Sequence, residues 1–331
     1  GRISTHDCNF NNQNDNVNVG SPIHIWRGGL GQYSFLHNTF HLGNSIGRMD
    51  SVFTGPEADA TGGWHKDSEY AHNQIYGAPD DGWQIDGGAV ACRFWDNLTV
   101  DCFRAFSAAP LAAGPAWVFR NRHYVPPDHF SRHWNNAGTA WIKIGGTNYR
   151  GPLFLYNNTF FADTPVDNGI LFAGIFHDGR YPNTVARNNV VIAAGRVAYL
   201  WFSGGSQSWD YDALGTRKWS GYFARLSNGD RVANLAEVQR LTGQELNGVD
   251  LGDGTTALMN PAALDFTPRP GSPLIERGID IPGVTDGFLG AAPDIGAVES
   301  GTGVAWPVAA FIADPTQGLV PLTVTFTDQS A

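Results

Sequence analysis

The stretch Leu155-Tyr156-Asn157-Asn158-Thr159-Phe160 sets two asparagines between a short apolar run and a further aromatic residue. Asparagine tolerates the left-handed backbone conformation and can hydrogen-bond its own backbone, so it suits a tight corner between two strands. If such corners stack, their side-chain amides can form a hydrogen-bonded ladder that satisfies buried polar groups. The stretch therefore predicts a corner in a stacked β-structure.

The same pattern recurs along the chain at variable intervals. Its other copies are Phe35-Leu36-His37-Asn38-Thr39-Phe40, Tyr70-Ala71-His72-Asn73-Gln74-Ile75, Phe94-Trp95-Asp96-Asn97-Leu98-Thr99, Val118-Phe119-Arg120-Asn121-Arg122-His123 and Ala186-Arg187-Asn188-Asn189-Val190-Val191. The final asparagines of the six copies are 35, 24, 24, 37 and 31 residues apart. A repeat of about 24 residues with insertions is typical of a β-solenoid, where loops of any length can leave the corners. Asn97 and Asn157 also match glycosylation sequons, and we assign both to the ladder.

Composition and charge narrow the class of protein. Of 331 residues, 41 are glycine and only 16% are charged, against about 25% charged residues in an average domain. Because glycine and asparagine are poor helix formers, a helical bundle or a coiled coil is disfavoured. A net charge of −10 argues against a nucleic-acid partner, and no apolar run is long enough to span a membrane. We expect a monomer.

The Asn-Asn-Thr-Phe corner resembles the corners of the right-handed parallel β-helix superfamily, the pectate-lyase-like fold, over about residues 1–300. Pro270-Gly271-Ser272-Pro273-Leu274-Ile275, followed by Ala292-Pro293-Asp294-Ile295-Gly296-Ala297-Val298-Glu299, is similar to the ending of bacterial members. The resemblance implies an all-β chain that begins inside such a helix. It also implies a C-terminal cap at about 266–300 that closes the open end, with Asp294 and Glu299 in structural roles.

Two segments depart from the repeat. Residues 205–265 are predicted to form an excursion over the last coils, with a short helix that carries Leu235, Val238 and Leu241 on one face and ends at Gly243. After a linker, residues 301–331 show two alternating stretches that resemble the opening of a PKD domain, an immunoglobulin-like β-sandwich of extracellular bacterial proteins. This resemblance implies an extracellular or cell-surface location and a chain that is cut inside that domain.

The first group of candidate site residues is acidic. Asp80 and Asp81 lie in a predicted turn, and alternation along the next strand sets Trp83 against the core and makes Gln84 and Asp86 project outward. Paired carboxylates can act as acid and base on a glycosidic bond, bind Ca²⁺, or simply start a turn. The Asp-Asp pair resembles that of polygalacturonase-type β-helices, but the chain lacks the Gly-His-Gly and Arg-Ile-Lys motifs that accompany it there.

The second group is basic. Lys143 alternates with two isoleucines, which predicts an outward side chain about two coils from Asp86, with Arg104 between them. At about 4.8 Å per coil, the gap is on the order of 10 Å, the length of a sugar unit. A lyase that cleaves uronate polysaccharides needs a cation for the uronate carboxylate and a base for the C5 proton. Lys143, Arg104 and His123 are candidates for these roles, although a solvated charge explains Lys143 equally well.

The remaining candidates belong to substrate binding. Asp80, Asp81, Asp86, Arg104 and Lys143 form the predicted catalytic set, and Trp83, Gln84, Arg120, His123, His177 and Arg180 the predicted substrate-binding set. A loop near residues 122–137 holds His129 and His133, but the two prolines in it do not favour a zinc site. Cys92 and Cys102 are close enough in sequence to be tested as a disulfide pair.

These observations predict a secreted enzyme that acts on a polysaccharide. A lyase for an acidic, uronate-containing polymer is favoured, because basic candidates accompany the carboxylates. It requires no cofactor, and Ca²⁺ is a candidate ligand. The alternatives are a glycoside hydrolase on the same scaffold, a non-catalytic extracellular rod that binds glycans, and a trimeric phage or virus tail fibre.

Overall fold

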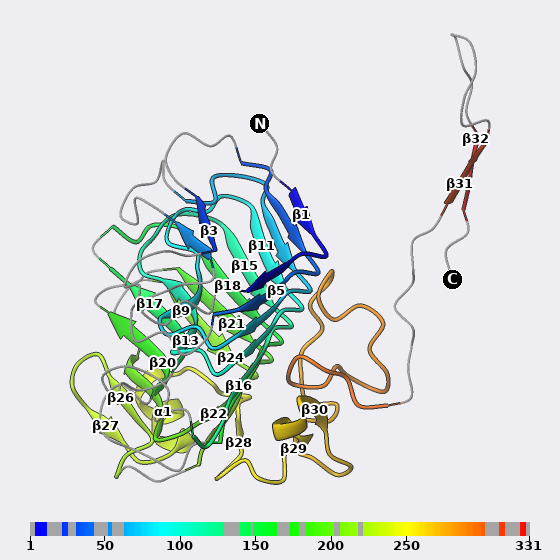
Figure 1. Ribbon diagram of the computed structural model, residues 1–331. Coiled ribbons are helices and arrows are strands. Elements are labelled where there is room, and N and C mark those ends of the chain that lie inside the picture. The colour runs from blue at the N-terminus through cyan, green and yellow to red at the C-terminus, as the bar shows by residue number, and fades with distance from the viewer. Residues whose placement is uncertain are drawn as a thin grey trace.

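The protein is all-β, with long parallel sheets and little helix. The computed structural model describes residues 4–11, 22–25, 31–42, 52–54, 63–128, 140–146, 148–163, 173–178, 183–201, 206–217, 221–301, 311–314 and 325–328. Short strands separated by tight corners follow one another throughout the first two-thirds of this part (Figure 1).

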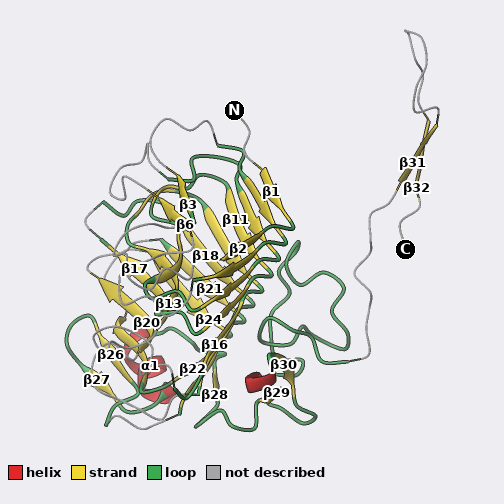
Figure 2. Cartoon of the chain, viewed as in Figure 1, coloured by secondary structure: helices red, strands yellow, loops and turns green. Residues whose placement is uncertain are grey.

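Three long sheets are built side by side as the chain visits each in turn (Figure 2). Sheet A contains β1 (Ser4–His6), β4 (Ser34–Leu36), β7 (Glu69–Ala71), β11 (Cys92–Trp95), β15 (Ala116–Phe119), β18 (Leu153–Tyr156), β21 (Thr184–Arg187) and β24 (Gln207–Asp210). Sheet B contains β2 (Asn9–Asn11), β5 (Thr39–His41), β8 (Gln74–Tyr76), β12 (Leu98–Val100), β16 (Arg122–Val125), β19 (Thr159–Ala162), β22 (Val190–Ala193), β25 (Ala213–Thr216) and β28 (Val249–Asp250). Sheet C contains β3 (Ile23–Ile25), β6 (Val52–Thr54), β9 (Asp81–Gln84), β13 (Arg104–Ala108), β17 (Ala140–Gly145), β20 (Ala173–Asp178), β23 (Arg196–Trp201), β26 (Ala224–Leu226) and β27 (Arg231–Val232).

The order of strands within each sheet is the order in which the chain completes its coils. Neighbouring strands are parallel, apart from the antiparallel pair of β26 and β27 at one edge of sheet C. Each coil therefore rests on the previous one, which is the arrangement expected of the predicted β-helix. Two small sheets flank the coils, one of β10 (Gly87–Gly88) with β14 (Leu111–Ala113) and one of β29 (Leu258–Asn260) with β30 (Asp265–Pro268).

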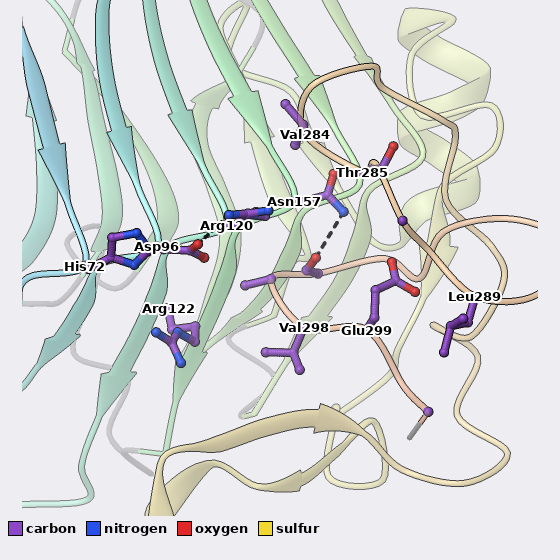
Figure 3. A pocket seen from close by; sticks show the side chains of 14 residues that line it. His72, Asp96, Arg120, Arg122, Asn157, Val284, Thr285, Leu289, Val298 and Glu299 are labelled. Carbon is purple, nitrogen blue, oxygen red and sulfur yellow. Dashed lines mark hydrogen bonds and ion pairs between the residues drawn. The ribbon is translucent and has the colours of Figure 1, made fainter. Parts of the chain in front are cut away.

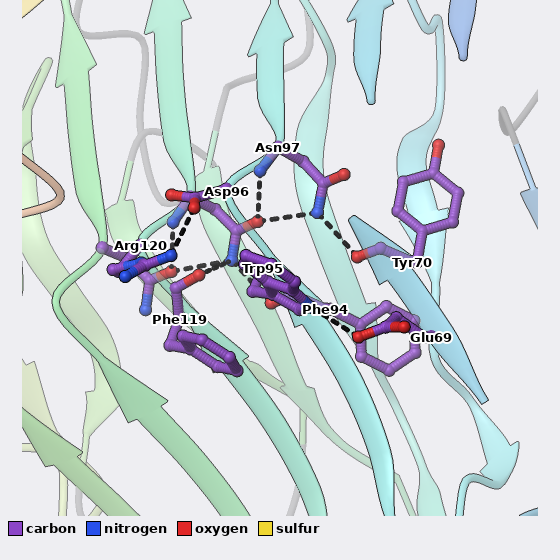
Figure 4. A network of polar contacts seen from close by, with 10 residues as sticks. Glu69, Tyr70, Phe94, Trp95, Asp96, Asn97, Phe119 and Arg120 are labelled. Carbon is purple, nitrogen blue, oxygen red and sulfur yellow. Dashed lines mark hydrogen bonds and ion pairs between the residues drawn. The ribbon is translucent and has the colours of Figure 1, made fainter. Parts of the chain in front are cut away.

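The asparagine ladder runs along the corner between sheets A and B, as predicted. The Oδ1 atom of Asn97 accepts hydrogen bonds from the backbone N of Asn73 at 2.9 Å and from its Nδ2 at 3.0 Å. The same two bonds link every successive pair of ladder members, Asn38, Asn73, Asn97, Asn121, Asn158 and Asn189. Figure 4 shows the part of this network around Asn97.

The structure corrects two details of the predicted ladder. Asn157 is not a ladder member, because its Nδ2 donates to the carbonyl of Gly296 at 3.1 Å on the outside of the corner. The repeat also continues into the predicted excursion, where β24 and β25 form one more corner and Asp212 accepts the bonds of Asn189 at 2.7 and 2.8 Å. Trp209-Asp210-Tyr211-Asp212-Ala213 is the same motif with aspartate in the ladder position.

The interior of the coils is filled by large aromatic side chains in contact with one another. Trp83 lies 3.7 Å from Phe106 and 5.0 Å from both Tyr70 and Phe94, measured between ring centroids. At the C-terminal end of the coils, α1 (Leu235–Thr242) adds Leu235 and Val238 to this core. The helix ends at Gly243, as predicted, and begins at the N-cap Asn234, but Leu241 is 45% exposed.

The segment predicted to close the open end lies along the side of the coils instead. Leu274, Ile295 and Phe266 pack with the outward residues of sheet B, including Val190 and Ile192. Backbone hydrogen bonds fix it there, since the N–H of Gly296 donates to the carbonyl of Asn188 at 2.8 Å. Asp294 accepts from the backbone N of Glu276 at 2.8 Å, which is the structural role predicted for it.

The last described strands are β31 (Phe311–Asp314) and β32 (Thr325–Asp328), which pair antiparallel with each other. Cys8, Cys92 and Cys102 are free, so Cys92 and Cys102 do not form a disulfide. Burial raises the pKa of both Cys92 and Cys102 to about 12, and these thiols behave as apolar core groups.

Candidate functional site

Strands β9, β13 and β17 are neighbours in sheet C and bring the predicted catalytic residues together. Gln84, Ser107 and Lys143 occupy equivalent positions on these three strands. The residues that precede them in the chain belong to the hydrophobic core, so the row lies on the outer face of the sheet. Ser107 was not predicted as a site residue, although its alternation with the core residue Phe106 would have placed it in this row.

Asp81, Arg104 and Lys143 form an ionic cluster on that face. Lys143 Nζ lies 3.0 Å from Asp81 Oδ2, and Arg104 Nη1 lies 3.8 Å from Asp81 Oδ1. The carboxylate thus lies between two cations that come from different strands. Arg104 belongs to the strand next to Asp81, whereas Lys143 reaches Asp81 across the intervening strand β13.

Exposure differs among the members of this cluster. The side chain of Asp81 is only 2% exposed, whereas that of Arg104 is 11% and that of Lys143 is 20% exposed. A molecule that approaches this face from solvent therefore meets the two cations before it meets the carboxylate. This arrangement suits an anionic ligand.

Asp86 completes the cluster from a buried position. Its Oδ1 accepts hydrogen bonds from Ser107 Oγ at 3.0 Å and from the backbone N of Ala109 at 2.6 Å. Only 1% of the residue is exposed, so it does not project into solvent as predicted. Burial raises the pKa of Asp86 to about 7, although the charge of Lys143 and the bond from Ala109 oppose this effect.

Lys143 remains a cation in this environment. Burial alone would lower its pKa, but the charges of Asp81 and Asp86 outweigh this effect and raise the pKa above the usual lysine value. A lysine base would need the opposite shift. With Asp86 protonated, the four ionisable groups carry a net charge of +1, and ionisation of Asp86 brings the sum to zero.

Two other predicted residues lie near the cluster. Asp80 is partly exposed in the turn before β9, and its carbonyl accepts from the backbone N of Arg104 at 3.5 Å. Gln84 is 5% exposed, and its carbonyl accepts from Trp64 Nε1 at 2.9 Å. Asp80 and Gln84 therefore flank the cluster.

Trp83 and His123 are inside the coils, which contradicts the substrate-binding role predicted for them. Trp83 is fully buried among aromatic rings. His123 is 1% exposed, its Nδ1 contacts Thr99 Oγ1, and its ring stacks on Phe160 with 5.3 Å between centroids. The alternation of β16 explains this, because Arg122 and Tyr124 take the outer face and His123 the inner one.

Arg120 lies apart from the cluster, on the outside of the corner between sheets A and B. It forms an ion pair with Asp96 of the preceding coil, shown in Figure 4. His177 belongs to β20, opposite Ile144 of β17, but its side chain is outside the described residues. Arg180, His129 and His133 are also outside the described residues.

Two general features bear on the class of site. In the part of the chain that the structure describes, no group of three or more His, Cys, Asp or Glu side chains is arranged to hold a metal ion. The described helices are also too short or too polar to cross a membrane.

Comparisons with known protein families, with curated proteins and with solved structures found no match.

Proposed function

We propose that the chain is a pectate-lyase-like parallel β-helix enzyme that cleaves an acidic, uronate-containing polysaccharide at the outer face of sheet C. The observation that carries this proposal is the pair of cations, Arg104 and Lys143, that lie on either side of Asp81 and are its more exposed neighbours. A uronate carboxylate supplies the negative charge that such a face attracts.

The proposed reaction is a β-elimination. Arg104 and Lys143 bind the uronate carboxylate and so make the adjacent C5–H more acidic. Asp81, the carboxylate next to both cations, is the base that we assign to the C5 proton. The electron pair of the C–H bond forms the C4–C5 double bond, and the glycosidic oxygen leaves with a proton from water. Lys143 stays charged throughout, because its pKa is raised.

A glycoside hydrolase is the second candidate, and the contrast between Asp81 and Asp86 favours it. One carboxyl with a pKa near 7 and one held beside cations is the usual division between general acid and base. Asp81 and Asp86 are each 1% exposed, so burial does not decide between the lyase and the hydrolase. A non-catalytic rod that binds glycans is the third reading.

The antiparallel strands β31 and β32 support a related proposal for the C-terminal region. We infer that they belong to a PKD-like β-sandwich, since Phe311–Asp314 and Thr325–Asp328 alternate in sequence and pair antiparallel. Such modules accompany extracellular bacterial enzymes, and we therefore propose a secreted or cell-surface location.

The test is an assay of the protein with pectate, alginate, a glycosaminoglycan and a neutral glycan, with and without added Ca²⁺ or a chelator. We expect the ultraviolet absorbance of an unsaturated product to rise with at least one uronate polymer. Reducing ends without this absorbance would establish the hydrolase instead. Binding without any product would establish the rod.

A further inference from the structure

A cavity lies where the C-terminal segment packs against the corner between sheets A and B. Figure 3 shows this cavity of about 410 Å³, with His72, Asp96 and Arg120 on one wall and Arg122 below them. Val284, Leu289, Val298 and Glu299 belong to the opposite wall. A volume of this size accommodates one monosaccharide unit.

The corner wall is built from the residue that precedes each ladder asparagine. His72, Asp96, Arg120 and Asn157 all have a positive φ, between 49° and 55°. In this conformation, the ladder asparagine turns inward and the preceding side chain turns outward. Successive coils therefore present a column of such side chains to the cavity.

The opposite wall is held firmly to this column. Asn188 Nδ2 donates to the carbonyl of Ile279 at 2.7 Å, and its Oδ1 accepts from the backbone N of Ile279 at 2.9 Å. Thr159 Oγ1 accepts from the backbone N of Ala297 at 2.9 Å. The cavity is thus a fixed feature between two parts of the chain that are more than 100 residues apart.

Arg122 is the cation of this cavity that is left for a ligand. The charge of Arg120 is matched by Asp96, but the Arg122 guanidinium makes no hydrogen bond or ion pair with any residue that the structure describes. Burial and the charge of Arg120 lower the pKa of Arg122, whereas the charge of Asp96 opposes this effect. A partly buried guanidinium has five N–H donors and is well suited to a carboxylate.

Glu299 faces the same space with an unsatisfied atom. Its Oε1 accepts from the backbone N of Asp294 at 3.0 Å, whereas its Oε2 is buried without a hydrogen-bond partner among the described residues. Burial and the neighbouring Asp294 raise the pKa of Glu299 to about 7. When protonated, this group can donate a hydrogen bond to an incoming ligand oxygen.

We infer that this cavity is a non-catalytic binding site for one acidic sugar unit, whose carboxylate pairs with Arg122. The sugar class rests on the proposed function, whereas the anion site follows from the cavity itself. Asp96 and Glu299 lie in the same cavity and disfavour a doubly charged ligand. The ligand is therefore a monoanion of monosaccharide size rather than a phosphate.

The experiment is a calorimetric titration of the full chain with galacturonate, galactose and inorganic phosphate at low ionic strength. Galacturonate is expected to bind, and galactose and phosphate at least tenfold more weakly. Arg122→Gln should weaken galacturonate binding at least tenfold. Arg93→Gln is the matched control, because Arg93 is exposed and outside the cavity, and it should bind as the wild type does.

Two further variants separate this inference from the enzyme proposal. Leu289→Trp, at a 37% exposed position on the rim, should fill the cavity and block binding without affecting the core. Lys143→Met removes a cation of the sheet C cluster, so the galacturonate binding that remains in this variant is assigned to the cavity. Wild-type affinity in both Arg122→Gln and Leu289→Trp, or no galacturonate binding by the wild type, would overturn the inference whatever the outcome of the lyase assay. Tighter binding of phosphate would overturn the choice of a monoanion.

Discussion

The ladder shows how one residue type meets two requirements of a stacked corner. From Asn73 onward, each asparagine amide accepts two bonds from the coil on one side and donates to the coil on the other, so these buried amides are satisfied. The asparagine ladder ends in two carboxyl groups. Asp212 accepts from Asn189 but has no amide group to donate. The buried carboxyl of Glu245 follows it, with Oε2 3.3 Å from the backbone N of Asp212.

This carboxyl pair makes stability depend on pH. Burial raises the pKa of Asp212 to about 6, and burial together with the charge of Asp212 raises the pKa of Glu245. Because both values are raised in the folded state, the stabilisation is complete below the unfolded-state values near 4 and is lost as the pH rises through about 6. Glu245→Gln keeps the hydrogen bonds and removes one ionisation. We expect it to be about 1–2 kcal/mol more stable than the wild type at pH 8 but not at pH 5.

Thermal unfolding of both proteins between pH 5 and pH 8 checks this expectation. Two melting curves that shift in parallel with pH would contradict it, because the variant would then have removed no pH-dependent ionisation.

Asp86 makes the charge of the sheet C cluster depend on pH. The groups that face it are Lys143, Asp81 and Ser107. Ionisation through a pKa of about 7 cancels the surplus positive charge, so the affinity for an acidic polysaccharide should fall with rising pH, on the order of tenfold. Asp86→Asn remains neutral and should keep the low-pH affinity at pH 8. Binding isotherms at pH 6 and pH 8 measure this, and an unchanged pH dependence in the variant would refute the role of Asp86.

At the scale of elements, α1 ends the coiled core by covering its last layer. Its first residue, Leu235, is 3% exposed, whereas Leu241, two turns later, is 45% exposed. Leu235→Ala should therefore lower the free energy of unfolding by about 2–5 kcal/mol. Leu241→Ala is the matched control and should change it by no more than about 0.5 kcal/mol. Urea denaturation measures both changes. An equal loss of unfolding free energy in the two variants would show that the helix does not close the core.

Helices and strands could be predicted where neighbouring residues in the sequence determine them. The helix had its cap residues Asn234 and Gly243, and the strands had their alternation and their corner asparagines. The coil around Asp212 was missed, because aspartate replaces the asparagine that marked the other corners. The exposure of Leu241 could not be read from helical spacing, since it depends on where the core ends rather than on the helix itself.

At the scale of the molecule, the position of the C-terminal segment could not be predicted from local sequence patterns. Its sequence predicts a terminal cap, but its backbone bonds to Asn188 and Thr159 hold it along the side of the coils. These contacts join residues about 90 to 140 positions apart, and no periodicity encodes them. The cavity around Arg122 results from the same long-range packing, so the sequence could not reveal it.

The candidate site was predictable only where local sequence patterns determine it. Counting coils placed Arg104 between Asp86 and Lys143, and Asp81 was predicted in the turn beside Asp86. The structure has Asp81 at the start of β9 and joins it to Arg104 and Lys143 in one ionic cluster. Alternation failed at Asp86, because it gives the face of a strand but not the depth of a side chain beneath its neighbours. It could have excluded His123, whose position in β16 faces the core.

In the proposed cleavage of an acidic polysaccharide, Lys143 acts as a cation. This role is tested by the rate of unsaturated product formation by Lys143→Met, compared with the wild type and with Lys66→Met, which removes an exposed lysine. We expect a loss of about a hundredfold or more in Lys143→Met, with the fold retained by circular dichroism, and no loss in Lys66→Met. Wild-type turnover by a folded Lys143→Met protein would contradict it.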